Sequence, residues 1–206
     1  MKTNLLLASA LAMSCVLPTL ASAQEAGTMT LGLGLHGVMP KSDNGTILGS
    51  TDLDVGDNVR PTVTFEYFVA NNIGIEVLGA LPFLHDIDAD GLGKIGSTKH
   101  LPPVVSVQYH FNSGETFSPF VGVGVNYTAF FDEKAKGAVA GSDLDLDDSW
   151  GLALHAGFDY KINEKNAFRT DVRWIDIDSD VKLDGAKIGE AEIDPWVFGV
   201  AYVHTF

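Results

Sequence analysis

The sequence has a single cysteine, Cys15, within its first 23 residues, and no later segment approaches the roughly 18 continuous apolar residues of a transmembrane helix. A protein without cysteines beyond its leader cannot depend on a disulfide scaffold. Helical membrane spans are excluded as well, because a span needs about 20 apolar residues. Stability must therefore come from a packed core or from a closed sheet.

Basic residues are scarce too. The chain has 13 Lys and Arg residues against 27 Asp and Glu residues, and its formal net charge is -14 at pH 7. Proteins that bind nucleic acids use Lys and Arg to neutralise phosphates, so this composition argues against a nucleic-acid partner. The aspartates gather in a few stretches, which we interpret as loops.

The first 23 residues have the features of a secretory signal peptide. Lys2 supplies a positive charge, residues 5–17 are apolar with only small or polar interruptions, and Ala21 to Ala23 form an A-x-A cleavage signal. We therefore predict a signal peptide at residues 1–23 and one exported domain at residues 24–206, whose length fits a single domain.

The chain has many stretches in which large apolar residues alternate with small or polar ones. In residues 117–131, FSPFVGVGVNYTAFF, one face carries Val121, Val123 and Val125, whereas Gly122 and Gly124 lie on the other. This period of two predicts a strand. Glycine weakens a strand without packing against anything, so it is a poor choice for a solvated face. A membrane barrel places the bulky apolar face against lipid and the small or polar face in its lumen.

The same pattern recurs in seven other segments, and long and short connections alternate between the predicted strands. The eight predicted strands are residues 28–39, 59–69, 73–83, 101–111, 117–131, 150–160, 168–174 and 193–206. The predicted long loops are residues 40–58, 84–100, 132–148 and 178–192. An even strand number with this asymmetry predicts an all-β fold: an eight-stranded antiparallel transmembrane β-barrel with short periplasmic turns and long extracellular loops. Such a barrel belongs in the outer membrane of a Gram-negative bacterium.

The last predicted strand ends at Phe206, on the same face as Trp196, Phe198 and Tyr202. A terminal Phe on a lipid-facing row suits a substrate of the machinery that inserts barrels into the outer membrane, although His204 on that row departs from the usual aromatic pattern. The predicted partners are therefore this machinery, outer-membrane lipid and lipopolysaccharide, and small apolar solutes.

A soluble, lipocalin-like barrel is the main alternative fold, because it also has eight antiparallel strands. That fold would need a polar exterior around an apolar cavity. Here the less apolar face carries seven ionisable residues that an apolar cup would not enclose. They are Glu66, Glu76, His110, Asp159, Arg169, Asp171 and Arg173. We predict that they form a charged plug in the lower, periplasmic half of the lumen.

The inward positions of the outer half are mostly apolar. The predicted solute path in this upper lumen consists of Leu78, Ala80, Pro82, Val104, Phe130, Ile175 and Val197. Our hypothesis is that small hydrophobic molecules enter passively from outside, are stopped by the charged plug, and leave sideways through the wall. Two other interpretations stay open: a closed barrel whose lumen is only a core, and an interaction barrel whose acidic loops act as an adhesin or as a phage or bacteriocin receptor.

Several segments resemble the OmpW/AlkL family of outer-membrane proteins. They are KHLPPVVSVQYHF at residues 99–111, FSPFVGVGVNYTAFF at residues 117–131, LDDSWGLALHAGFDY at residues 146–160, VRWIDID at residues 172–178 and IDPWVFGVAYVHTF at residues 193–206. The resemblance implies an eight-stranded barrel with a narrow, hydrophobic upper channel, implicated in the uptake of small apolar molecules that leave sideways into the membrane. In related barrels the inward position of Arg173 can be apolar, and a guanidinium there would narrow and polarise the pore.

Motifs for catalysis or metal binding are weak. Asp86, Asp88 and Asp90 match the first half of an EF-hand loop, but Ser97 stands where the bidentate Glu is needed. We expect solvated acidic loops, with loosely held divalent ions near lipopolysaccharide phosphates. The six histidines are scattered, which argues against zinc, and no G-x-S-x-G motif supports a serine hydrolase. We therefore predict no enzyme activity, no catalytic residues, no metal site and no cofactor.

Overall fold

The structure is a computed structural model, and it describes residues 24–112 and 114–206. The predicted signal peptide lies outside these residues. The described chain is built of antiparallel strands and one short 3-10 helix, η1 (Gly137–Val139). Among the described residues, no helix has the length and apolar character needed to cross a membrane.

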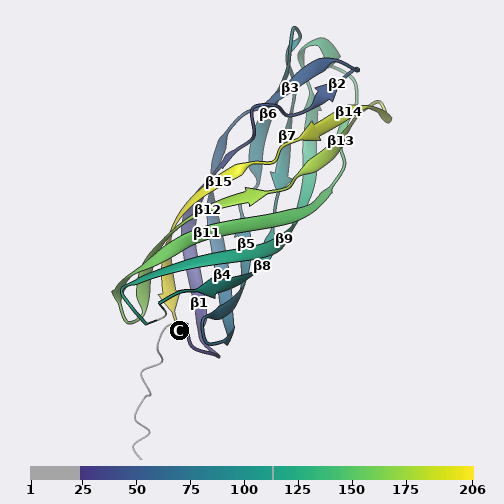
Figure 1. Cartoon of the computed structure of the whole chain (residues 1–206). Coiled ribbons are helices and arrows are strands. Elements are labelled where there is room, and N and C mark those ends of the chain that lie inside the picture. Colours follow the sequence, from purple (N-terminus) through teal and green to yellow (C-terminus); the bar gives the residue numbers. More distant parts are fainter. Residues whose placement is uncertain (1–23, 113) are drawn as a thin grey trace, which may run out of the picture.

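Eight of the strands close into a barrel, which confirms the predicted fold. In barrel order they are β1 (Met29–Met39), β4 (Asn58–Ala70), β5 (Ile73–Ala80), β8 (Val104–His110), β9 (Phe117–Ala135), β11 (Ser149–Asn163), β12 (Asn166–Ile175) and β15 (Trp196–Thr205). The barrel closes where β1 pairs with β15, for example Leu35 opposite Val200. Its strands rise as one tilted cylinder in Figure 1.

The predicted long loops are not loops in the structure, because most of their residues form further strands. These are β2 (Thr46–Ile47), β3 (Thr51–Val55), β6 (Phe83–Ala89), β7 (Gly93–Leu101), β10 (Leu144–Leu146), β13 (Asp178–Leu183) and β14 (Ala186–Glu192). With the upper part of β9 they form a second run of sheet, β9-β7-β6-β3-β2-β14-β13-β10, which we call the outer extension. Figure 1 shows it at the end of the barrel opposite the C-terminus.

The outer extension forms because its aspartates alternate with apolar residues. Asp86 is exposed and Asp88 is partly exposed, whereas Ile87 between them is buried. Asp145 is exposed between buried Leu144 and Leu146. This is the pattern of a strand with one solvated face. The aspartate count suggested loops, but the alternation was the stronger signal.

The opposite end of the barrel has short turns, as predicted. The turn between β4 and β5 contains Asn72 with a φ of 68°, and the turn between β8 and β9 contains Asn112 with a φ of 52°. Asn tolerates this left-handed conformation better than most residues do. We call this end the turn end.

The outer surface of the barrel is apolar. Val121, Val123 and Val125 on β9 are 47%, 51% and 52% exposed, whereas Phe120 and Asn126 on the other face are buried. Aromatic residues flank these rows, with Phe168 and Tyr202 near the turn end and Tyr127 against Trp150 near the outer extension. A continuous apolar surface of this kind is suited to contact with hydrocarbon. We call it the apolar belt.

The inward glycines make room for large polar side chains from neighbouring strands. A Cβ on Gly122 would lie 2.1 Å from Nε2 of His155, and one on Gly74 would lie 2.1 Å from Oε1 of Glu66. The glycines of β9 therefore face the lumen, as predicted. Their role is to let an imidazole or a carboxylate lie against the barrel wall.

One predicted face is wrong. The predicted strand of residues 73–83 placed Leu78, Ala80 and Pro82 inward, so by alternation it placed Phe83 outside, but Phe83 is only 2% exposed. The reason is an interruption: β5 ends at Ala80, and β6 begins at Phe83 after the turn-like residues Leu81 and Pro82. Because side chains alternate with a period of two, this interruption reverses which residues face inward.

Candidate functional site

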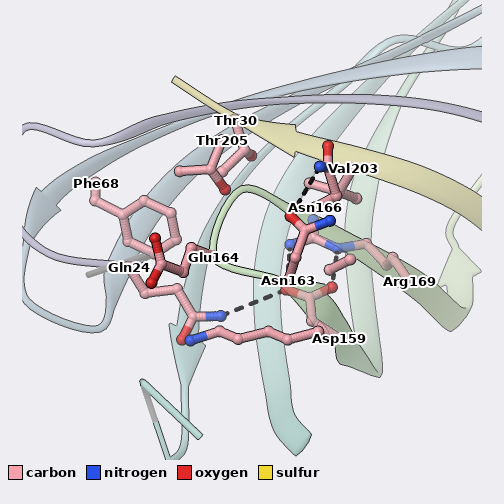
Figure 2. Close-up of a pocket in the computed structure, with 12 residues that line it drawn as sticks. Gln24, Thr30, Phe68, Asp159, Asn163, Glu164, Asn166, Arg169, Val203 and Thr205 are labelled. Atoms are coloured by element: carbon pink, nitrogen blue, oxygen red, sulfur yellow. Dashed lines mark hydrogen bonds and ion pairs between the residues drawn. The ribbon is translucent and has the colours of Figure 1, made fainter. Parts of the chain in front are cut away.

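The lower lumen is filled by a network of ionised side chains centred on Arg169 of β12. Its Nε donates to Asp159 Oδ1 at 2.7 Å, and its Nη2 donates to Asp159 Oδ2 at 2.9 Å. Nη1 donates to Glu76 Oε2 at 2.8 Å, and Nη2 also donates to Glu66 Oε2 at 3.0 Å. One guanidinium thus bridges three carboxylates from β4, β5 and β11. Figure 2 shows Arg169 beside Asp159 in this region.

A second guanidinium, Arg173, continues the network two inward positions above Arg169, with Asp171 between them. Its Nε donates to Asp171 Oδ2 at 2.6 Å, and its Nη2 lies 2.9 Å from Glu76 Oε1. Glu76 therefore contacts both guanidinium groups. His36 of β1 joins from across β15, with Nε2 3.4 Å from Asp171 Oδ1 and Nδ1 2.7 Å from Thr62 Oγ1.

His110 closes the network at the turn end. Its Nε2 lies 2.8 Å from Glu66 Oε1, and its Nδ1 lies 3.1 Å from Nε2 of Gln24, which also donates to Asp159 Oδ2 at 3.4 Å. Figure 2 shows Gln24 reaching toward Asp159. The cavity beside these residues holds about 20 Å³, enough for about one water molecule. A solute therefore meets no open path at this end.

All seven residues predicted for the charged plug are brought together, and each is at most 5% exposed. We use the name charged plug for these seven. Three further members, His36, Phe120 and Gln24, were not predicted. Phe120 lies with its ring 4.6 Å from Cζ of Arg169, and its inward position on β9 could have indicated this. Gln24 is buried under the barrel, and nothing in its sequence context signals that role.

The upper lumen is mostly apolar. Leu78, Val104, Phe130, Ile175 and Val197 are buried in one hydrophobic cluster, and Ala80 packs at its edge. Pro82, predicted for the same path, is only partly buried and lies where the chain passes from β5 to β6. The predictions missed that much of this cluster comes from the outer extension. Its contributors there include Ile47, Leu53, Ile95, Leu144 and Val181.

Two histidines line the upper lumen within the outer extension, beyond the apolar belt. The rings of His85 and His100 stack with centroids 4.7 Å apart, and His100 also contacts Phe83 and Phe130. Burial lowers the pKa of both side chains, and it lowers that of His100 well below the usual value, with a further contribution from His85. Both rings are therefore neutral at pH 7, so they keep the upper lumen free of charge.

The barrel wall is interrupted beside the upper lumen. The ladder between β5 and β8 ends at Leu78 opposite Val104, and pairing resumes between β6 and β7 at Phe83 opposite His100. The interruption contains Pro82, Pro102 and Pro103. Proline has no N–H group, so it cannot donate to a ladder. We call residues 79–82 with 101–103 the wall break.

Among the described residues, one acidic group has the arrangement of a possible cation site. Carboxylate oxygens of Asp176, Asp178 and Asp194 lie within 4.8 Å of one another, near the junction of barrel and outer extension. Lys41 already lies 3.0 Å from Asp194. Burial and the neighbouring carboxylates of Asp194 and Asp176 raise the pKa of Asp178 to about 6.

The EF-hand-like stretch has a different structure. Asp86 and Asp88 lie within the strand β6 rather than in a calcium-binding loop. Asp86 forms ion pairs with Lys94 and Lys136 on the surface of the outer extension. Its carboxylate therefore has basic partners from the protein itself.

Comparisons with known proteins agree with this architecture. A model of the OmpW family matches residues 25–206. Outer membrane protein W of Vibrio cholerae serotype O1 is 41% identical over 197 residues, covering 89% of this chain and 91% of that protein. Outer membrane protein AlkL of Ectopseudomonas oleovorans is 32% identical over 169 residues, covering 79% of this chain and 72% of that protein.

A solved structure shows the same fold. The crystal structure of the outer membrane protein OprG from Pseudomonas aeruginosa matches with a TM-score of 0.79 at 33% sequence identity, covering 89% of this chain and 97% of that chain. The closed barrel and its apolar belt are thus those of a Gram-negative outer-membrane protein, and the chain belongs to the OmpW family.

Proposed function

We propose that this protein is a passive channel for small hydrophobic molecules, which enter the upper lumen from outside and leave sideways above the charged plug. The observation that carries the proposal is the position of the plug. Residues of both the barrel and the outer extension form an apolar cluster. This cluster lies directly above a buried ion-pair network that fills the lower lumen.

The energies favour this route over passage straight through the barrel. A hydrocarbon gains about 0.8 kcal/mol for each CH₂ group that it removes from water. To continue downward it would have to separate Arg169 from its carboxylates, and breaking a buried ion pair costs about 3–5 kcal/mol. A solute of a few carbons is therefore bound by the upper lumen and stopped at the plug.

The wall break supplies the proposed exit. It lies between Leu78 and Val104 of the barrel and Phe83 and His100 of the outer extension, all of them inward residues of the upper lumen. Because three prolines interrupt the ladder there, neighbouring strands separate without losing regular hydrogen bonds. Within the wall break, Leu81 points outward and is 58% exposed beside the apolar belt.

The acidic segments favour the channel over a receptor that presents free loops. Their strands turn apolar residues such as Ile87 and Leu146 toward the lumen cluster, so they form its upper wall. We infer that their solvated carboxylates face lipopolysaccharide, whose phosphates share divalent ions with them. The proposed chemistry is diffusion, with no covalent step and no cofactor.

The test is a flux measurement in vesicles whose outer leaflet is lipopolysaccharide. Ala153 faces the upper lumen and is fully buried, whereas its neighbour Leu154 is 44% exposed on the apolar belt. We expect Ala153→Phe to fill the lumen and lower toluene flux at least tenfold, and Leu154→Phe to leave it unchanged. Sucrose should cross no faster than in protein-free vesicles. Equal toluene flux with and without the protein, or rapid sucrose flux, would show that the channel proposal is wrong.

We also propose that the barrel insertion machinery recognises Phe206. Its side chain is 65% exposed beyond the end of β15, although its N–H donates to the carbonyl of Met29 at 3.1 Å. Phe206→Ser should lower the folded fraction in the outer membrane several-fold, while the same variant refolds normally in detergent. Normal assembly of the variant in cells would argue against this role.

A further inference from the structure

Buried polar atoms without partners lie where the upper lumen meets the charged plug. Among the described residues, no hydrogen-bond partner is found for Ser106 Oγ, for either side-chain polar atom of Gln108, for either ring nitrogen of His155, or for Nη1 of Arg173. These side chains are 2%, 0%, 6% and 0% exposed. We call the four of them the polar floor.

The polar floor spans three strands. His155 of β11 is directly opposite Arg173 of β12, and its imidazole lies over Gly122 of β9. Gly122 is in turn opposite Gln108 of β8. Ser106 lies one inward position above Gln108, facing Glu76 across the β5–β8 ladder.

The polar floor lies immediately below apolar residues of the same strands. Val104, Ala153 and Ile175 lie two residues beyond Ser106, His155 and Arg173 respectively, on the same inward face. A molecule that rests on the floor thus has its other end in the apolar cluster.

Polar groups that are buried in folded proteins nearly always have partners, because a buried donor or acceptor that stays unpaired costs free energy. The floor offers donors on Arg173 and Gln108, acceptors on Gln108, and groups on Ser106 and His155 that can serve as either. We propose that it binds the polar group of an amphipathic solute whose apolar part lies in the upper lumen. This inference rests on the channel function proposed above.

The charge of the surroundings selects the polar group. The ion-pair network that Arg173 links to the floor contains four carboxylates, on Glu66, Glu76, Asp159 and Asp171, against two guanidinium groups, on Arg169 and Arg173. A carboxylate on the solute would add to this excess of negative charge, and such a like charge is unfavourable at close range. A pure hydrocarbon would leave every floor atom unpaired. The preferred solutes are therefore uncharged alcohols, phenols or amides with an apolar body.

The experiment is an NMR titration of the whole barrel in lipid nanodiscs with 1-hexanol, hexane and hexanoate. The side-chain amide of Gln108 reports on the floor, and the methyl groups of Val104 and Ile175 report on the upper lumen. We expect 1-hexanol to shift both sets of signals, hexane to shift only the methyl signals, and hexanoate to leave the amide unmoved.

Two variants and a control separate floor binding from filling of the lumen. Gln108→Leu and Ser106→Ala should each weaken 1-hexanol binding, read at the methyl groups, about five- to tenfold, the effect of one lost hydrogen bond. Val107→Ala alters the apolar belt on the same strand, where Val107 is 50% exposed, and should keep the affinity within about twofold.

The outcomes distinguish this inference from the channel proposal. If hexane and 1-hexanol move the methyl signals equally and neither floor variant weakens the alcohol, only water occupies the floor and the inference is overturned, while the channel stands. If neither hexane nor 1-hexanol shifts the methyl signals, the channel proposal is wrong, and the inference that rests on it is wrong as well.

Discussion

Replacing Arg169 with methionine tests whether the lower lumen is a true buried ion-pair network. The guanidinium makes four hydrogen bonds to three carboxylates at 2.7 to 3.0 Å, and it is 3% exposed. Each bond to a charged partner contributes about 1.5–3 kcal/mol, although the cost of burying the charges offsets much of the sum. Removing the guanidinium leaves the three carboxylates buried without its positive charge to compensate them. We therefore expect Arg169→Met to lower the free energy of unfolding by about 3–5 kcal/mol.

The assay is reversible urea unfolding in lipid vesicles, followed by tryptophan fluorescence and by the gel mobility of unboiled protein. Lys182→Met is the matched control, because Lys182 lies 2.5 Å from Asp147 in a partly exposed ion pair at the surface of the outer extension. Exposed pairs are worth about 0–1 kcal/mol, so the control should hardly change stability. Adding Asp159→Asn to Arg169→Met removes one stranded charge and should restore part of the loss.

An Arg169→Met barrel within about 1 kcal/mol of the wild type would refute the reasoning. So would a double variant less stable than Arg169→Met alone. In either case the carboxylates would not depend on the guanidinium for compensation, and the lower lumen could not be the barrier that stops a hydrophobic solute.

Three further predictions concern stability. Gly122→Ala places a methyl group 2.1 Å from His155 and should cost about 1–3 kcal/mol, whereas Gly79→Ala, whose nearest contact is at 3.7 Å, should change stability little by the same measurement. His100→Phe should keep or raise stability, since neither ring nitrogen of His100 has a partner among the described residues. Because burial lowers the pKa of His100, the wild type should lose stability relative to this variant as pH falls below about 6.5. Urea titrations at several pH values would reveal this difference. The raised pKa of Asp178, about 6, has the opposite sign: the wild type should lose stability relative to Asp178→Asn as pH rises from 5 to 7, and a constant difference would contradict this.

The barrel itself was predictable from the sequence because its two faces differ throughout. Rows such as Val121, Val123 and Val125 have only one suitable environment, and a register slip of one residue would bury them and expose the other face. The same reasoning placed Arg169 and Glu66 in the lumen, because an ionised side chain on the apolar belt would be costly. The period-two alternation and the positions of the ionised residues were together sufficient to predict the lower half of the barrel.

The outer extension was not predictable by the same criteria. Its strands are short, such as Thr46–Ile47 and Leu144–Leu146, and their aspartates resemble loop composition. What makes them strands is pairing with partners distant in the chain, for example Gly189 with Ile47. Such pairings depend on the barrel that brings the connections together, so the alternation within these short runs could not by itself show that they pair as strands.

The reversal at Phe83 had a different cause. The alternating pattern continued smoothly through Pro82, and only the three-dimensional path shows that β5 stops at Ala80. Proline is a known interruption of central strands, so Pro82, Pro102 and Pro103 together were a signal that deserved more weight than the alternation. The same prolines now define the proposed exit.

The position of this exit relative to the polar floor links the two proposals. On β8 and the residues before it, Gln108 and Ser106 belong to the floor, Val104 belongs to the apolar cluster, and Pro103 and Pro102 belong to the wall break. Two residues of a strand span about 7 Å, so the lumen changes from polar to apolar to interrupted wall within a few residues of one strand. A solute held at the floor by its polar group would have its apolar part beside the wall break. The barrier and the exit are therefore adjacent features of one strand, and a solute stopped by the first is already next to the second.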